Sequence, residues 1–160
     1  MSDAPLLLRV CALLDEAGVP YERLRHAEAR STEALAEARG MPVSVSVKAL
    51  VFRIKGRFTV LALRADQTMD NRAVRRMLKA QKLRFARLEE LAALGLAPGQ
   101  VPPFGEPVLP ARLAADARIL DTPTVAFTAG THTDSLILAT DDWIRVAAPD
   151  LLSFTGATPH

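Results

Sequence analysis

The chain of 160 residues contains a single cysteine, Cys11, and lacks any run of about 18 uncharged apolar residues. One cysteine excludes an internal disulfide framework and fits a reducing compartment. Without a long apolar run, we expect no transmembrane helix and no membrane partner. The early Leu6-Leu7-Leu8 cluster is interrupted by Arg9, and no small-residue cleavage site follows it. We therefore predict a cytoplasmic protein.

The usual sequence motifs of cofactor and metal chemistry are missing as well. There is no Walker-type phosphate loop and no G-x-G-x-x-G, and the three histidines are scattered without metal-ligand spacing. We therefore expect neither a metal nor a cofactor. His132, Asp134 and Ser135 supply the residue types of a serine triad. We reject that interpretation, because near neighbours on one strand cannot point at one another as a triad requires.

Acidic residues are scarce in the middle of the chain. Between Lys48 and Arg87 there are twelve Lys and Arg residues against two acids, Asp66 and Asp70, which gives this segment a charge of +10 and the remainder −8. Such segregation predicts a basic face for a polyanion such as nucleic acid. The alternative is an ordinary solvated helix surface.

Length and composition favour one domain over residues 1–160, with 49% hydrophobic residues available for its core. Helical and strand patterns are intermixed, without the regular alternation of a doubly wound sheet. We therefore expect an α+β domain with a largely antiparallel, partly closed mixed sheet, barrel-like, surrounded by helices.

Local patterns predict the individual elements. The predicted helices cover residues 4–17, capped by Ser2 or Asp3, then 31–39, 71–80 and 88–94, with a helical turn at 149–154. The predicted strands cover residues 21–25, 49–54, 58–64, 108–114, 124–128 and 135–139, the second and third joined as a hairpin through Lys55-Gly56-Arg57.

The predicted helix over residues 71–80 is amphipathic. Val74, Met77 and Leu78 are expected to face the core. Its basic side chains should face outward and are the candidate nucleic-acid contacts: Arg72, Arg75, Arg76 and Lys79.

The stretch Pro98-Gly99-Gln100-Val101-Pro102-Pro103-Phe104-Gly105 predicts a stiff loop. Proline fixes φ and glycine permits positive φ or a close approach to the main chain. We expect Phe104 to anchor the loop in the core and the amides of residues 99–101 to remain free for a ligand. The alternative is a rigid surface turn. Lys48, at the entry of a strand, can direct a cation into a cleft and bind phosphate there, or it can be a solvated surface residue.

Taken together, several segments resemble the YbaK/ProX family of aminoacyl-tRNA deacylases, which is related to the editing domain inserted in bacterial prolyl-tRNA synthetases. They occur in the family's order: Ser31-Thr32-Glu33-Ala34, Val47-Lys48-Ala49-Leu50-Val51, Leu61-Ala62-Leu63-Arg64-Ala65-Asp66, Gly99-Gln100-Val101-Pro102-Pro103-Phe104-Gly105 and Phe127-Thr128-Ala129-Gly130. The resemblance covers most of the chain and is greater to the stand-alone members, with Pro-Pro-Phe in the loop, than to a synthetase insertion.

The resemblance implies hydrolysis of the ester that joins a wrong, small amino acid such as Ser or Ala to the terminal adenosine of a tRNA. Lys48 matches the lysine that holds the terminal phosphate. The residues matching the loop that positions the aminoacyl ester are Gly99, Gln100, Val101, Pro102 and Pro103. In such a mechanism a substrate hydroxyl assists, and no side-chain nucleophile is required. The implied partners are mischarged tRNA, which the basic helix would also contact, and an aminoacyl-tRNA synthetase.

The candidate residues around the amino acid are Thr32, Ala49, Thr128, Gly130, His132 and Ser135. Ala49 stands where many relatives carry Thr or Asn, and Thr128 stands where alanine-specific relatives carry His. The specificity of those relatives is therefore not transferred. Thr32 can equally serve its helix N-terminus. A function of another class is also open, that of a non-catalytic nucleic-acid-binding protein that uses the helix at 71–80.

Overall fold

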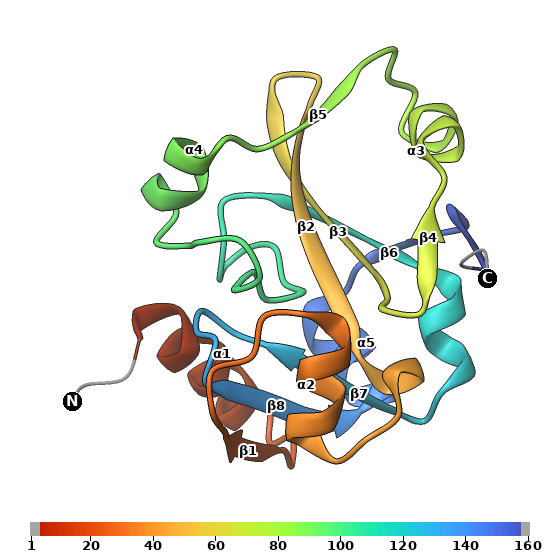
Figure 1. Ribbon diagram of the computed structural model, residues 1–160. Coiled ribbons are helices and arrows are strands. Elements are labelled where there is room, and N and C mark those ends of the chain that lie inside the picture. Colours follow the sequence, from red (N-terminus) through yellow and green to blue (C-terminus); the bar gives the residue numbers. More distant parts are fainter. Residues whose placement is uncertain (1–3, 158–160) are drawn as a thin grey trace.

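The computed structural model describes residues 4–157, whose strands form three sheets (Figure 1). The largest has the strand order β5 (Leu83–Phe85), β2 (Val47–Ile54), β3 (Arg57–Arg64), β6 (Arg112–Asp116) and β9 (Asp150–Leu152). The second has the order β1 (Glu22–Arg25), β8 (Asp134–Ala139) and β7 (Thr124–Thr128), and the third pairs β10 (Thr155–Ala157) with β4 (Gln67–Met69). The helices are α1 (Pro5–Glu16), α2 (Thr32–Arg39), α3 (Asn71–Met77), α4 (Leu88–Ala93) and α5 (Thr140–Ala147), with 3-10 turns η1 (Val43–Val45) and η2 (Ala117–Asp121).

The predicted α+β class is confirmed, and the strand pairs of residues 4–157 are antiparallel except β3 with β6 and β6 with β9. The sheets do not close into a barrel in this part of the chain, so that detail of the expectation was wrong. A single parallel bridge between Ser46 and Ala126 links the two larger sheets. No helix of residues 4–157 is long and apolar enough to cross a membrane.

The β2–β3 hairpin is the centre of the largest sheet and confirms the predicted hairpin. Its turn contains two residues, Lys55 and Gly56, at φ of 53° and 74°, the geometry that suits the twist of a two-residue hairpin. Strand β2 starts earlier than expected, so Lys48 lies within it and pairs with Leu63.

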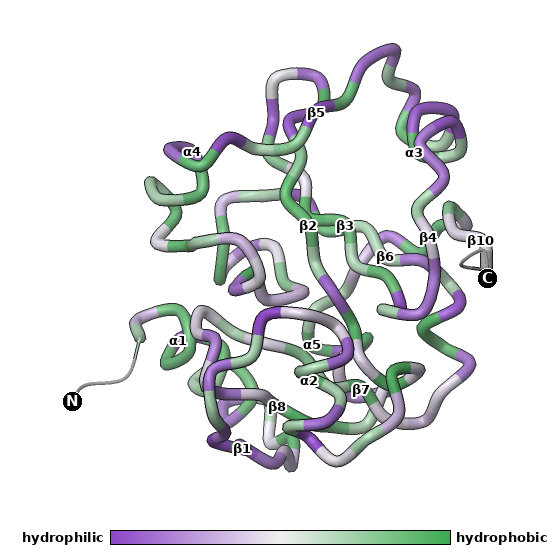
Figure 2. Tube along the Cα trace, viewed as in Figure 1, coloured by the Kyte–Doolittle hydropathy of each residue, from purple (hydrophilic) through white to green (hydrophobic). Residues whose placement is uncertain are grey.

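Both faces of the large sheet are covered. Side chains alternate along its strands, so neighbouring residues enter two different hydrophobic cores. Val51, Val60 and Ala62 join the core shared with α1, β7 and β8. On the opposite face, Phe52 and Leu61 belong to a second core with α3 and Phe154, as its buried cluster shows. Figure 2 shows hydrophobic residues along the middle of β2 and β3, and hydrophilic ones on α3.

Helix termini follow the predicted capping residues. Ser31 Oγ accepts a hydrogen bond from the Ala34 amide at 3.0 Å, and Gly40 ends α2 at φ +66°. Asp70 caps α3, which ends at Met77, three residues before its predicted end. Met77 was predicted to face the core but is 38% exposed, and its sulfur accepts a hydrogen bond from the Ser153 amide at 3.3 Å.

Other sequence-based boundaries were wrong near the end of the chain. Residues 150–152 form strand β9 rather than a helical turn, because they pair with the exposed edge of β6. Strand β6 begins at Arg112 rather than at residue 108. Helix α5, which buries Trp143, was not predicted, nor were the three-residue strands β4, β5 and β10. The cap expected at Ser2 or Asp3 lies outside the described residues.

Asp116 joins the large sheet to the last strands. Its carboxylate is 1% exposed and accepts hydrogen bonds from the Phe154 amide at 2.7 Å, the Thr155 hydroxyl at 2.7 Å and the Arg118 amide at 3.1 Å. Charged acceptors make hydrogen bonds that are shorter and stronger than neutral ones.

We predict that Asp116→Ala lowers the free energy of unfolding by about 3 kcal/mol, because it leaves the buried Phe154 amide without an acceptor. Urea unfolding monitored by circular dichroism measures the change. Glu37→Ala removes an exposed carboxylate from α2 and should shift the unfolding free energy by less than about 0.5 kcal/mol. Equal stabilities of the two variants would contradict the assigned role of Asp116.

Candidate active site

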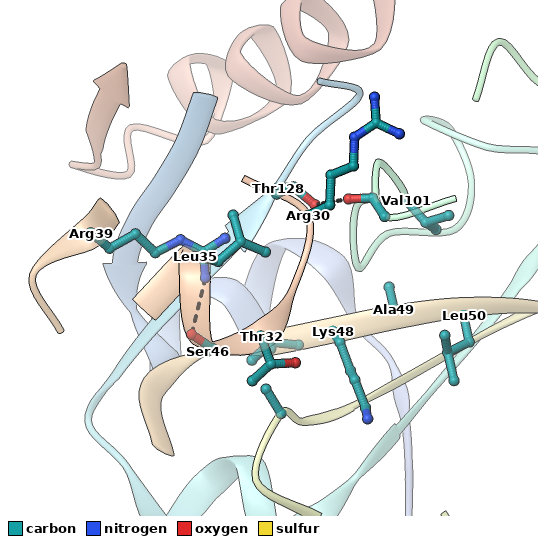
Figure 3. A pocket seen from close by; sticks show the side chains of 13 residues that line it. Arg30, Thr32, Leu35, Arg39, Ser46, Lys48, Ala49, Leu50, Val101 and Thr128 are labelled. Carbon is teal, nitrogen blue, oxygen red and sulfur yellow. Dashed lines mark hydrogen bonds between the residues drawn. The ribbon is translucent and has the colours of Figure 1, made fainter. Parts of the chain in front are cut away.

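A pocket of about 190 Å³ lies between α2, the first half of β2, the glycine and proline loop and the end of β7 (Figure 3). It lies at the edge of β2 opposite β3, where the first half of β2 has no second partner strand, since β5 pairs only with residues 52–54. The pocket is lined by Arg30, Thr32, Leu35, Arg39, Ser46, Val47, Lys48, Ala49, Leu50, Ala65, Gly99, Val101 and Thr128.

The loop at residues 98–103 is held by the connection between β7 and β8. Thr128 Oγ1 donates to the Gly99 carbonyl at 2.9 Å, and the Gly130 amide donates to the Gln100 carbonyl at 2.7 Å. His132 Nε2 lies 2.9 Å from the Pro98 carbonyl. Because a carbonyl only accepts, His132 carries its proton on Nε2. Three consecutive carbonyls of the loop are thus fixed from one side.

Two aromatic residues fix the far end of the loop. Trp143 Nε1 donates to the Pro103 carbonyl at 3.0 Å, and this indole is fully buried. Phe104 is 1% exposed and packs edge-to-face against Phe127, with ring centroids 5.7 Å apart. The predicted anchoring role of Phe104 is confirmed.

The amides of the loop differ in availability. Gly99 has φ of +84°, so the loop needs the conformation that glycine adopts readily. The Gln100 amide donates to the Ala97 carbonyl at 3.1 Å and is not free, contrary to the prediction. The amides of Gly99 and Val101 have no acceptor among residues 4–157. These two are the backbone donors that the loop can offer to a ligand.

Lys48 lines the pocket from the edge of β2 that β5 leaves free, and its side chain extends beside Thr32 (Figure 3). The structure gives its ammonium no ion pair with any described residue, whereas the neighbouring Arg30 pairs with Glu28 at 2.8 Å. The hydrogen bond from Arg30 lowers the pKa of Glu28. Lys48 is therefore a cation at the pocket that no carboxylate of residues 4–157 neutralises.

Arg39 is a second pocket cation and is 8% exposed. Its Nε donates to Ser135 Oγ at 2.7 Å and its Nη1 donates to Ser46 Oγ at 3.0 Å. His26 Nε2 lies 2.8 Å from the same Ser135 hydroxyl. Burial lowers the pKa of Arg39 to about 10, so the guanidinium stays charged at neutral pH.

A family model described as the aminoacyl-tRNA editing domain matches residues 26–146, which include every residue that lines the pocket. The chain belongs to this family. The Multifunctional Ser/Thr-tRNA deacylase ProXp-y of Escherichia coli K12 is 32% identical over 153 residues, covering 91% of this chain and 90% of that protein. The predicted YbaK/ProX membership and the predicted deacylase class are thereby confirmed.

Other relatives of this editing domain agree with the assignment. The Proline–tRNA ligase of Sulfurihydrogenibium is 30% identical over 87 residues, which cover 54% of this chain and 15% of the ligase. A crystal structure of a candidate trans-editing enzyme for prolyl tRNA synthetase is 25% identical and covers 98% of this chain and 100% of that one, with a TM-score of 0.82.

Six of the predicted site residues line the pocket, and six other predicted site residues do not line it. The predicted residues that line it are Thr32, Lys48, Ala49, Gly99, Val101 and Thr128. Those that lie behind the lining are Gln100, Pro102, Pro103, Gly130, His132 and Ser135. Ser135 bonds to Arg39 and His26, and no bond joins it to His132, so the rejection of a serine triad was correct.

The sequence reasoning missed Arg39, Ser46, Leu35 and Arg30 as pocket residues. Arg39 stands in the last turn of α2 before Gly40, where a basic residue usually complements the helix dipole. Its signal was the spacing of Thr32, Leu35 and Arg39 at i, i+3 and i+7, which places the three on one helix face.

The predicted basic face lies at the other end of β2. Arg72 and Arg76 are exposed on α3 and Arg75 is half-buried there, whereas Lys79 is exposed just after the helix, at φ 52°. A surface hollow of about 610 Å³ lies beside the hairpin turn, lined by Arg53, Lys55, Gly56, Arg75, Gln81, Lys82, Leu83 and Arg84. Hydrogen bonds from the Arg84 side chain and the Arg87 amide lower the pKa of Glu90 to about 2.

Proposed function

We propose that this editing domain deacylates mischarged aminoacyl-tRNA by hydrolysing the ester at the terminal adenosine, with a small amino acid such as Ser or Ala as its substrate. The relative named as a Ser/Thr-tRNA deacylase supports serine and adds threonine to the candidates. The pocket of about 190 Å³ suits a small side chain. We further propose that residues 1–160 act as one editing domain, in association with an aminoacyl-tRNA synthetase.

One observation carries the proposal: the same pocket of a family member is lined by Lys48, whose ammonium has no ion pair, and by Gly99 and Val101, whose amides have no acceptor among residues 4–157. In this scheme Lys48 binds the phosphate next to the terminal adenosine, because a compact ammonium suits a phosphate as a point charge. The amides of Gly99 and Val101 bind the ester carbonyl oxygen, where negative charge develops.

The chemistry needs no side-chain nucleophile. Water attacks the carbonyl carbon, the bond to the ribose oxygen breaks, and one proton of the water ends on the ribose oxygen, which becomes a hydroxyl. The amino acid leaves as a carboxylate while the second proton of the water passes to solvent, and a neighbouring ribose hydroxyl assists the proton transfer. Thr128 and His132 contribute by fixing the loop, since their hydrogen bonds to the Gly99 and Pro98 carbonyls hold the adjacent amides in position.

The basic face would contact the remainder of the tRNA. Lys48 and the hairpin turn stand at opposite ends of β2, about 20 Å apart at the rise of an extended strand. A tRNA whose end enters the pocket would pass the cations of the hairpin and α3. The same basic face also supports the second candidate function, that of a non-catalytic nucleic-acid-binding protein.

Incubation with Ser-, Ala-, Thr-, Cys- and Pro-charged tRNA, followed by measurement of the remaining ester, separates the two functions. Ester loss above the uncatalysed rate supports the deacylase. Binding of uncharged and charged tRNA with no ester loss from any of them would favour the non-catalytic alternative.

We predict that Lys48→Ala lowers kcat/KM by about 10- to 100-fold, the loss expected for one hydrogen bond to a charged group. The fold should be unaffected, because this ammonium has no partner in the described chain. Arg118→Ala is the matched control, since it removes an exposed cation outside the basic segment. Similar kcat/KM values for Lys48→Ala and wild type would contradict the phosphate role.

A second prediction concerns Gly99, where a Cβ would lie 3.2 Å from His132 Nε2. Gly99→Val should reduce single-turnover deacylation by about 100-fold or more, comparable with the loss of an oxyanion donor. Gly56→Val is the control, because Gly56 also has positive φ but nothing within 4 Å. Backbone strain is then common to both variants, and equal rates would mean that the loop does not position the ester.

A third prediction concerns α3. Replacing Arg72, Arg75 and Arg76 with Glu should weaken tRNA binding and flatten its salt dependence, because each lost phosphate contact removes counterion release. The preference among amino acids should persist. Binding measured between about 50 and 200 mM salt gives the slope.

The control for α3 is a triple substitution of Arg9, Arg118 and Arg145 with Glu, which changes the net charge equally outside the basic segment. Matching slopes for the two triple variants would show that α3 is an ordinary solvated helix surface.

A further inference from the structure

The guanidinium of Arg39 has donor capacity that the protein leaves unused. Its bonds to Ser46 and Ser135 engage Nε and Nη1, and Nη2 has no acceptor among residues 4–157. Among residues 4–157, the only fully buried side-chain nitrogen or oxygen atom without a hydrogen-bond partner is Gln67 Oε1. Arg39 Nη2 also has no partner, so it is not fully buried and solvent can reach it. Since Arg39 lines the pocket, the pocket is where this donor can meet a ligand.

The surroundings of Arg39 are unusual for a buried arginine. Buried arginines are normally paired with a carboxylate, because taking an unpaired charge out of water is costly. Here the hydrogen-bond partners of the guanidinium are two neutral hydroxyls, and burial lowers the pKa of Arg39. The two serines fix the orientation of the guanidinium without neutralising it. Such an arrangement keeps a strong donor available to a bound molecule.

The position of Arg39 suits one part of the substrate. Figure 3 shows the Lys48 ammonium pointing away from the Arg39 guanidinium, which lies beside Leu35. With the phosphate at Lys48 and the ester at Gly99 and Val101, the end of the pocket at Arg39 remains for the amino-acid side chain. Leu35 and Val47 supply apolar lining there, enough to contact a methyl group.

We propose that Arg39 selects amino-acid side chains that carry a hydroxyl group, by donating a hydrogen bond from Nη2 to the hydroxyl oxygen. This inference rests on the proposed deacylase function and adds the residue that distinguishes serine and threonine from side chains without a hydroxyl. Arg39 touches the substrate, whereas Ser46 and Ser135 are positioning residues. A hydrogen-bonding site of this kind discriminates strongly against an isosteric side chain that lacks the hydroxyl.

The test uses isosteric pairs of charged tRNA on the same tRNA body, so that only the hydroxyl differs: Thr against Val, and Ser against 2-aminobutyrate. Wild type should prefer the hydroxyl member of each pair by about tenfold or more in kcat/KM, the discrimination expected of one hydrogen bond from a charged donor. Rates are corrected for uncatalysed hydrolysis of each ester. An Asp-charged tRNA is included as an anionic side chain.

Arg39→Met keeps much of the side-chain length without a donor, and it should bring both ratios close to one while Val-tRNA hydrolysis changes little. Ser46→Ala should lower the ratios partially, because it frees the guanidinium to move. Arg30→Met is the matched control at the exposed pocket rim and should retain the wild-type ratios. Circular dichroism establishes folding.

Several outcomes would overturn the inference. These are equal wild-type rates for Thr and Val, unchanged ratios in folded Arg39→Met, equal losses on all esters in that variant, or faster hydrolysis of the Asp ester than of the Ser and Thr esters. If Arg39→Met does not fold, the Thr/Val and Ser/2-aminobutyrate ratios of kcat/KM, measured for wild type and for Ser46→Ala, still test the inference. Wild type that hydrolyses none of the esters would refute the proposed function itself, which is a distinguishable result.

Discussion

The pocket depends on the attachment of the loop at residues 98–103 to the connection between β7 and β8. Thr128, Gly130 and His132 donate to three successive carbonyls of the loop, so its acceptors point toward the sheet. The amides of Gly99 and Val101 are left without partners in residues 4–157. A backbone site of this kind is preorganised, because binding requires no reorientation of its donors. The Trp143 bond to the Pro103 carbonyl adds a second, distant point of attachment.

Lys48 and Arg39 are the two pocket cations without a carboxylate partner among residues 4–157, and they differ in how their charge is solvated. Lys48 retains contact with water at the open edge of β2, so its charge costs little. Arg39 is buried and uses serine hydroxyls to compensate part of its lost hydration. The nearest ion pair of the pocket, Arg30 with Glu28, stands at the rim and is exposed. The pocket therefore combines a hydrated cation at its edge with a buried hydrogen-bond donor whose orientation is fixed.

Much of the fold could be predicted where the signal was local. Capping and φ preferences predicted the ends of α2, at Ser31 and Gly40, and the hairpin turn at Lys55-Gly56. The location of the pocket was predicted from Lys48 and the loop at residues 98–103. Predictions were poorer where long-range pairing decides: β9 forms because β6 offers a free edge, and Arg39 enters the pocket through bonds to residues 7 and 96 positions away. The prediction of a free Gln100 amide was wrong for a local reason, because this amide donates to the Ala97 carbonyl within a turn and composition does not reveal such hydrogen bonds.

Asp116 and the last strands have a consequence for the order of folding. Strand β9 completes the large sheet, β10 pairs with β4, and Phe154 fills the second core only when its amide reaches Asp116. These contacts join segments separated by long stretches of chain, and such contacts form slowly. During synthesis, the core beneath α3 must stay incomplete until residues 150–157 emerge from the ribosome. The nascent chain can bury its other core and form most of the pocket before the side that carries the basic helix is consolidated.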